Sequence, residues 1–299
     1  MRVSARRSLV TALFTVLSLA GCSDSSGPAP LLERPIVFTG TSALQPAAHD
    51  IYTINSDGSG LTNLTKGTVG DALNPRWSPD GTQIAFVAGN NAPYEGWVMQ
   101  RDGSGAHVVS NPNDWCTAYV RLSWSPSGDR LLGDCEMVEQ FVINISDRTS
   151  YSLTQRWGNV ADYPDWSPVD DRIAYLRGPN ISVANLDGSN GKVVAADANE
   201  AAWSPDGNRI AFIRLNANQS QAIWIVNADS TKEQSVTSPA NRTISDDAPA
   251  WSPDGSRIVF WRIESDNPRG MAYLAVVNAD GGTPKRITAD TLLATRADW

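Results

Sequence analysis

The sequence predicts an all-β fold, a six-bladed β-propeller built from four-stranded antiparallel blades. Three observations lead to this fold: a tryptophan recurs at one register, a turn of similar composition follows it, and β-rich segments follow the turn. The tryptophans lie 37 to 48 residues apart, at positions Trp77, Trp124, Trp166, Trp203, Trp251 and Trp299. A period of this length is typical of a stacked or circular array of repeats.

A tight turn follows each tryptophan except the last. Its sequence is Ser-Pro-Asp-Gly after Trp77, Trp203 and Trp251, and near variants follow the other two. Proline presets φ for the second turn position, aspartate suits the third, and glycine adopts a positive φ at little cost. In one variant Asp170 occupies the glycine position. We expect it to adopt the positive φ there, because aspartate tolerates that conformation.

The turn leads into further strands. A second strand, such as QIAFVA from Gln83 or RIAFIR from Arg209, is rich in β-branched and aromatic residues. A third strand ends in asparagine and a second turn, and a short fourth strand closes the unit, as in LTNLT from Leu61 and KRIT from Lys285. Four antiparallel strands in a unit of this length predict one propeller blade.

The two ends of the repeat region predict how the ring closes. The first unit, from Arg34 to Thr65, has strands two to four but lacks the strand that bears the tryptophan. Residues 295–299 resemble that missing strand and have no turn after them. We expect 295–299 to complete blade 1, giving six complete blades and leaving no open sheet edge at the junction.

The first 21 residues predict a lipoprotein signal peptide. Arg2, Arg6 and Arg7 precede a short apolar run, a layout typical of a secretory signal rather than a membrane span. Residues 19–22, Leu-Ala-Gly-Cys, resemble the bacterial lipobox, which implies cleavage before Cys22 and lipidation of its thiol. The alternative is a plain signal peptide with a chance cysteine.

Residues 22–33 predict a flexible polar tether, and residues 34–299 the propeller. Ser23 rather than aspartate follows the lipidated cysteine, which in the families that this leader resembles favours the outer membrane. We therefore expect a monomer in the bacterial cell envelope that faces the periplasm and contacts the membrane through its lipid anchor only.

The charge balance excludes one class of partner. The formal charge is −8, and removal of the three leader arginines with the signal peptide takes it to −11. A chain this acidic is not expected to bind nucleic acid.

The repeat resembles a known family. Trp-Ser-Pro-Asp-Gly followed by Ile-Ala-Phe and then Asn-x-Asp-Gly resembles the TolB-type β-propeller repeat, over roughly residues 34–299. The resemblance implies the propeller fold and is weak for function, because many chemistries and many non-enzymes share this fold. TolB proteins also carry an α/β domain ahead of the propeller, and we do not expect one in this sequence, in which only about 33 residues precede the first repeat. Their peptidoglycan-associated lipoprotein partner is therefore not carried over.

Strand polarity predicts where a binding site lies. The short, regular turns after strands one and three share one face, whereas the variable connections between strands two and three and between blades share the other. We call the opening around the axis on this second face the channel mouth. The predicted binding residues there are Trp115, Arg121, Trp157, Asp162, Tyr163, Glu200, Asp247 and Arg296. They suit an envelope protein, peptidoglycan or another polar ligand, or else they only cap turns and pack between blades.

Catalytic patterns are scarce. The two histidines, His49 and His107, form no metal-binding pattern, and no serine-nucleophile motif is present, so we expect no metal and no cofactor. The alternative function is a carbohydrate-active hydrolase or lyase that uses paired carboxylates at the mouth. The candidate pairs are Asp246 with Asp247 and Asp162 with Glu200. The favoured prediction is a non-catalytic binding or scaffolding protein.

Two cysteines besides Cys22 flank the first hairpin of the third blade. Cys116 and Cys135 fall toward the same end of its first two strands. In an oxidising compartment this arrangement predicts a disulfide on the loop-rich face. The alternative is two buried thiols.

Overall fold

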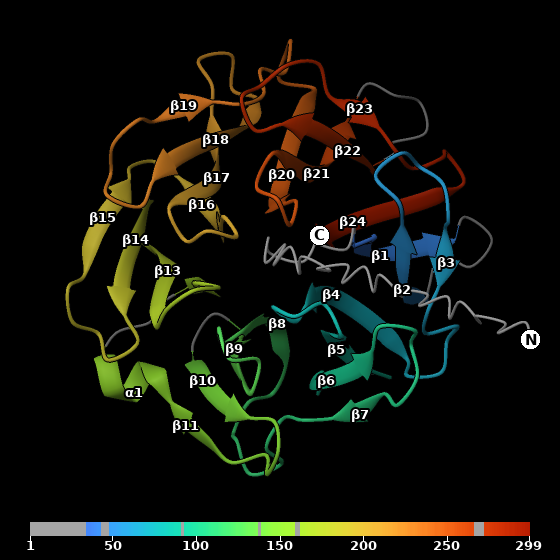
Figure 1. Ribbon diagram of the computed structural model, residues 1–299, viewed down its shortest axis with the longest axis vertical. Coiled ribbons are helices and arrows are strands. Elements are labelled where there is room, and N and C mark those ends of the chain that lie inside the picture. Colours follow the sequence, from blue (N-terminus) through green and yellow to red (C-terminus); the bar gives the residue numbers. More distant parts are fainter. Residues whose placement is uncertain (1–33, 43–47, 91–92, 137–138, 159–161, 266–271) are drawn as a thin grey trace, which may run out of the picture. The chain divides into compact units, whose positions relative to one another are not determined.

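Six four-stranded sheets lie in a ring in the computed structural model, with the tryptophan-bearing strand of each sheet nearest the axis (Figure 1). The structure describes residues 34–42, 48–90, 93–136, 139–158, 162–265 and 272–299. The predicted signal peptide and tether, including Cys22, lie outside the described residues. The predicted six-bladed propeller is confirmed.

The sheets are numbered here as blades in chain order, each listed from its innermost strand outward. Blade 1 contains β24 (Leu292–Asp298), β1 (Ile36–Ser42), β2 (His49–Ile54) and β3 (Thr62–Asn63). Blade 2 contains β4 (Asp71–Trp77), β5 (Gln83–Gly89), β6 (Glu95–Gln100) and β7 (His107–Val108). Blade 3 contains β8 (Tyr119–Trp124), β9 (Arg130–Cys135), β10 (Glu139–Asn144) and β11 (Ser150–Ser152).

The second half of the chain supplies the other three blades. Blade 4 contains β12 (Asp162–Trp166), β13 (Arg172–Arg177), β14 (Asn180–Asn185) and β15 (Lys192–Ala195). Blade 5 contains β16 (Asn199–Trp203), β17 (Arg209–Leu215), β18 (Gln221–Asn227) and β19 (Gln234–Ser235). Blade 6 contains β20 (Ile244–Trp251), β21 (Arg257–Glu264), β22 (Ala272–Asn278) and β23 (Lys285–Arg286).

Blade 1 joins the two ends of the described chain. Strand β24 pairs antiparallel with β1, with Val37 opposite Asp298 and Thr39 opposite Thr295. Strand β1 therefore has a hydrogen-bonded neighbour on each side, as the closure prediction required.

The apolar core is divided among the blades. One phenylalanine of the second strand is fully buried in four of them: Phe38, Phe86, Phe212 and Phe260. Full burial of such a side chain contributes about 1.5–3 kcal/mol. The equivalent position holds Gly133 in blade 3 and Tyr175 in blade 4, so four of the six blades share this packing pattern.

The tryptophans lie between neighbouring blades. The indole N–H of Trp124 donates to the Arg76 carbonyl of the preceding blade, and that of Trp251 donates to the Ala202 carbonyl. The arginine that begins a second strand stacks on the tryptophan of the next blade at 4.4–4.9 Å, in the pairs Arg130 on Trp166, Arg172 on Trp203, Arg209 on Trp251 and Arg257 on Trp299. In blade 2 this position is held by Gln83. The arginines thus connect most blades in series.

The turns after the innermost strands largely follow the prediction. Gly81 and Gly207 have φ of 70° and 65°, and their N–H groups donate to the serine carbonyl three residues earlier. Asp170 is a correction: its φ is not positive, and no equivalent backbone hydrogen bond forms within the described residues of its turn. Its carboxylate instead accepts from the backbone N–H and Nε of Arg172. A positive φ is costly for a residue with a Cβ, so this turn opens.

One short helix, α1 (Leu153–Trp157), directly follows strand β11 of blade 3. Ser152 caps its first turn by accepting from the Gln155 N–H, and Gly158, at φ 67°, ends it. Within the described ranges, no helix is long and apolar enough to cross a membrane.

Candidate functional site

A β-bulge interrupts each innermost strand close to the axis. In five blades the bulge includes the residue three positions before the tryptophan, and in β8 it falls between Tyr119 and Arg121. The five bulged residues have φ between 47° and 53° and are Asn74, Tyr163, Glu200, Ala248 and Arg296. A left-handed conformation costs an ordinary residue about 1–2 kcal/mol. A bulge re-aims the side chain that it carries, and here the re-aimed side chains meet near the axis.

Glu200 is bound by arginines from two other blades. Both of its carboxylate oxygens lie 2.7 Å from Nη1 of Arg296, and Oε2 lies 3.4 Å from Nη2 of Arg121. Arg121 belongs to blade 3, Glu200 to blade 5 and Arg296 to blade 1, so the contact joins alternate blades. Burial acts to raise the pKa of Glu200, but the two guanidinium groups outweigh it and lower the pKa. The carboxylate is therefore held in its charged form.

Two further bulge residues extend this network. The guanidinium carbon of Arg121 lies 4.9 Å from the centroid of the Tyr163 ring. Asn74 donates from its side-chain amide to the carbonyl of Val120, next to Arg121. Four of the predicted binding residues, Arg121, Tyr163, Glu200 and Arg296, are thus in one contact network.

A second layer of charges lies closer to the turn face, directly before the tryptophans. Asp298 accepts from the backbone N–H of Trp77 at 2.7 Å and from Arg76 at 3.3 Å. Asp165 accepts from the backbone N–H of Trp203 at 3.0 Å. Burial acts to lower the pKa of Arg76, but the negative charges of Asp298 and Asp165 outweigh it and raise the pKa. These contacts link neighbouring blades and keep the bulge layer in place.

The two predicted carboxylate pairs have different surroundings. Asp246 is fully buried and forms a bidentate ion pair with Arg262 at 2.6 and 2.8 Å. Burial, and then the negative charge of Glu200, raise the pKa of its neighbour Asp247. In the other pair Glu200 is held by the two arginines, whereas burial raises the pKa of Asp162. Neither pair therefore consists of two free carboxylates.

Asp134, on β9, is a buried acid that the sequence analysis did not identify. It is fully buried, and its Oδ1 accepts from the side-chain amide of Gln140 at 3.3 Å. Burial is the main cause of its raised pKa, and the negative charge of Asp162 adds to the effect. The sequence feature that could have indicated it is an acidic residue that follows the apolar residues of the second strand RLLGDC, which begins at Arg130.

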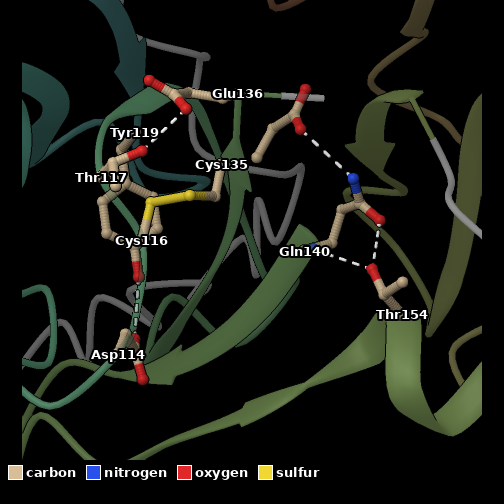
Figure 2. The surroundings of a disulfide bond; sticks show 9 residues. Asp114, Cys116, Thr117, Tyr119, Cys135, Glu136, Gln140 and Thr154 are labelled. Atoms are coloured by element: carbon tan, nitrogen blue, oxygen red, sulfur yellow. Dashed lines mark hydrogen bonds between the residues drawn. A yellow bond between two sulfur atoms is a disulfide. The ribbon is translucent and has the colours of Figure 1, made fainter. Parts of the chain in front are cut away.

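A disulfide joins Cys116 and Cys135 on the loop-rich face, with a Cα–Cα distance of 5.6 Å. Figure 2 shows hydrogen bonds on either side of it, from Tyr119 to Asp114 at 2.8 Å and from Thr117 to Glu136 at 2.7 Å. The same view shows Gln140, which bonds Thr154. These contacts fix the loop that carries Trp115.

Trp115 is the most exposed large apolar side chain among the described residues, with 61% of its surface accessible. Its ring packs edge-on against Phe141 at 6.0 Å between centroids. An aromatic side chain that is held on one edge and exposed on its other surfaces can contact a ligand without losing much conformational entropy.

Trp157 does not join the mouth residues. It ends helix α1, where its ring lies 5.2 Å from that of Tyr175 and its indole N–H donates to the Leu186 carbonyl. Leu186 lies in the turn after β14, on the face opposite to the mouth.

The histidines contact nearby loop groups. His49 lies 3.3 Å from Asp71, and His107 lies 2.8 Å from the carbonyl of Gly105. Within the part of the chain that the structure describes, no three His, Cys, Asp or Glu side chains form a group that could hold a metal ion.

Comparison with protein families identifies the repeat. The family model described as the TolB beta propeller domain matches residues 156–299. This range contains blades 4 to 6 and the closing strand β24. The resemblance of the repeats to the TolB type is confirmed.

Solved structures share the fold at low sequence identity. TolB from Acinetobacter baumannii has a TM-score of 0.70 and 16% identity, with 89% of this chain and 66% of that chain covered. An oligogalacturonate lyase in complex with manganese has a TM-score of 0.56 and 17% identity, with 81% and 71% covered. Similarity at these identities shows the fold alone.

Curated relatives match part of the chain. A protein of Agrobacterium fabrum described as uncharacterised is 29% identical over 168 residues, which are 55% of this chain and 47% of the relative. A probable dipeptidyl peptidase 4 of Arthroderma benhamiae is 24% identical over 182 residues, covering 46% of this chain and 22% of the relative. The chain spans less than half the length of these relatives.

Proposed function

Because its repeats are of the TolB β-propeller type, we propose that this protein is a non-catalytic binding or scaffolding protein of the bacterial cell envelope. Its partner, an envelope protein, peptidoglycan or another polar ligand, binds at the channel mouth. The proposal includes lipidation at Cys22, which holds a monomeric propeller at the outer membrane on the periplasmic side.

The observation that carries the proposal is the ring of bulges. Five residues with side chains adopt a positive φ at one register, and several of them bring charged or aromatic groups toward the axis. Backbone strain at non-glycine residues clusters at functional sites. The mouth is therefore the part of the ring most specialised for a ligand.

The loop beside the mouth supports the same proposal. Trp115 is exposed, while its neighbour Cys116 is covalently fixed to β9. Exposed, preorganised tryptophans contribute strongly to protein interfaces and stack well on polar ring compounds. Such a side chain suits binding by preformed contacts.

The state of the acids favours binding over hydrolysis. The raised pKa values of Asp162 and Asp247 suit a general acid, so the other member of each pair would have to be a free carboxylate that activates water. Glu200 is instead held by its two arginines. Asp246 is engaged by Arg262. Both candidate carboxylate pairs thus lose one member to an ion pair, which weakens the case for a carbohydrate-active enzyme.

Capture from the native envelope tests the binding function. The full-length lipoprotein is cross-linked in cells, purified and compared with Trp115→Ala and with Val193→Ala. Val193 is a matched control because it is also exposed, at 52%, but lies on the outer strand β15. We expect Trp115→Ala to lose the captured partner and Val193→Ala to keep it. Equal capture by both variants, or turnover of oligosaccharides by the purified protein, would contradict the proposal.

Fractionation tests the anchor separately. In a Cys22→Ser variant the lipid attachment site is absent, so the chain should move from the membrane fraction to the soluble periplasmic fraction. Unchanged membrane association, or no incorporation of labelled fatty acid by the native chain, would show that the leader is not a lipoprotein signal.

A further inference from the structure

Two carboxylates at the boundary between blades 3 and 4 each have a buried oxygen with no hydrogen-bond partner. These oxygens are Oδ2 of Asp134 and Oδ1 of Asp162. An unpaired buried acceptor costs about 1–3 kcal/mol, and more when it is charged. Native proteins rarely retain such groups unless a ligand or another partner uses them.

Both carboxylates lie on the boundary between the two blades. Asp134 stands opposite Arg121 on one neighbouring strand and opposite Gln140 on the other, so the three side chains share one face of blade 3. Strand β9, which carries Asp134, contacts β12 of blade 4, so this face lies against that blade. Asp162 directly precedes Tyr163 on β12. The two unpaired oxygens therefore belong to the same boundary, beside the bulge network.

The charges at this place do not balance. Arg121 and Arg296 both contact Glu200, Asp134 and Asp247 lie near Arg121, and Asp162 lies near Asp134. A third arginine, Arg76, also acts on Glu200, but its main partners are Asp298 and Asp165, so Arg121 and Arg296 remain for these four carboxylates. Burial raises the pKa of each of the three aspartates, so each costs free energy when it is ionised without a cation. A cationic ligand group would remove this cost.

The arrangement of oxygens selects the kind of cation. The described residues contain no group of three acidic or histidine side chains suited to a metal ion. A guanidinium prefers the two oxygens of one carboxylate, but Oδ1 of Asp134 is already engaged by Gln140. An ammonium group is compact and carries three donors, and it can bond single oxygens of two different carboxylates.

We propose that the channel mouth binds a primary ammonium group of its ligand, with Asp134 Oδ2 and Asp162 Oδ1 as the acceptors. This inference rests on the proposed binding function of the mouth and assigns the chemistry of the ligand. A lysine side chain and a free amino group of a peptide both carry the group.

Titration with a small ammonium compound tests the assignment. The full chain is titrated with N-α-acetyl-lysine methylamide, and binding is followed by saturation-transfer NMR and by the shift in melting temperature. The Nε-acetylated form of the same compound is the ligand control, because it keeps the shape but lacks the charge. We expect saturable binding of the first compound and none of the second.

Protein variants locate the site. Asp134→Asn and Asp162→Asn should each weaken binding about tenfold or more, because each replaces a charged acceptor. Asp187→Asn is the matched control: Asp187 is an exposed acid of the same blade 4, in the turn after β14 on the opposite face, and its loss should leave affinity unchanged. Melting curves of all variants show whether they fold.

Two results would overturn the assignment: no saturable binding by the folded native chain, or undiminished binding by a folded Asp134→Asn/Asp162→Asn double variant. The failure of this inference is distinct from that of the proposed function. If Trp115→Ala loses envelope capture but the native chain does not bind the ammonium compound, the mouth remains the proposed binding site. Only the proposed chemistry of the ligand is then refuted.

Discussion

Trp299→Ala is the most direct test of how the ring is held closed. The Trp299 side chain is 3% exposed and packs in the apolar cluster that also contains Ile36 and Phe38. Its indole N–H donates to the Arg34 carbonyl at 3.0 Å, and the Arg257 guanidinium lies 4.4 Å from its ring. The substitution therefore removes a buried ring, a hydrogen bond and a cation–π contact at one place.

The expected loss can be estimated from these contacts. Replacement of a buried tryptophan by alanine costs about 3–5 kcal/mol of the free energy of unfolding. Each kcal/mol lowers the melting temperature of a chain this long by roughly 2–4 °C. We therefore expect a fall of roughly 6–20 °C in a calorimetric or circular-dichroism melt.

Trp115→Ala is the matched control, because it makes the same substitution at an exposed position. It should change the free energy of unfolding by only about 0.5 kcal/mol. Deletion of 295–299 should lower the melting temperature further and produce association in light scattering, because it bares the edge of β1. A melt of Trp299→Ala within about 2 °C of the native chain would refute this account of closure.

Three other substitutions test particular contacts. Gln83→Arg should raise the free energy of unfolding by about 0.5–1 kcal/mol, because it supplies the arginine that would stack on Trp124; an unchanged denaturant midpoint would contradict this. Asp134→Asn should raise the melting temperature at neutral pH, because the raised pKa of the aspartate makes its ionised form costly. This gain in melting temperature should be largest above the raised pKa of Asp134 in the folded state. It should vanish as the pH falls toward about 4, the pKa of an aspartate in the unfolded chain. A gain that does not change with pH would contradict this explanation. Replacement of both Cys116 and Cys135 by serine should cost about 2–4 kcal/mol, and a melt insensitive to reductant would show that the bond contributes little.

Most of the fold was accessible from the sequence because the repeat has a strong local signal. The tryptophan period, the Ser-Pro-Asp-Gly turns and the β-rich second strands predicted all six blades and the closing strand. Local departures were not predicted. Asp170 did not take the glycine conformation, and residues 153–157 formed a helix, for which Ser152 and Gly158 were available as capping signals.

The candidate site was accessible only in part. Arg121, Glu200 and Arg296 share one position relative to the tryptophan, but the bulge that brings them together is a property of backbone pairing. The sequence could not give the distances that decide which acid contacts which arginine. Asp134 lies near the end of a second strand and not in a connection between blades, and only the pairing of β9 with its two neighbours shows that it stands opposite Arg121 and Gln140.

The pairing of β1 with β24 also determines the order in which the molecule can be completed. Strand β1 is made early and its neighbour β24 is made last, with most of the polypeptide between them. The loop entropy of such a distant contact is lost only at the final step of folding, so this step is expected to be slow. Until β24 pairs with it, β1 therefore presents a bare hydrogen-bonding edge that other extended segments could join.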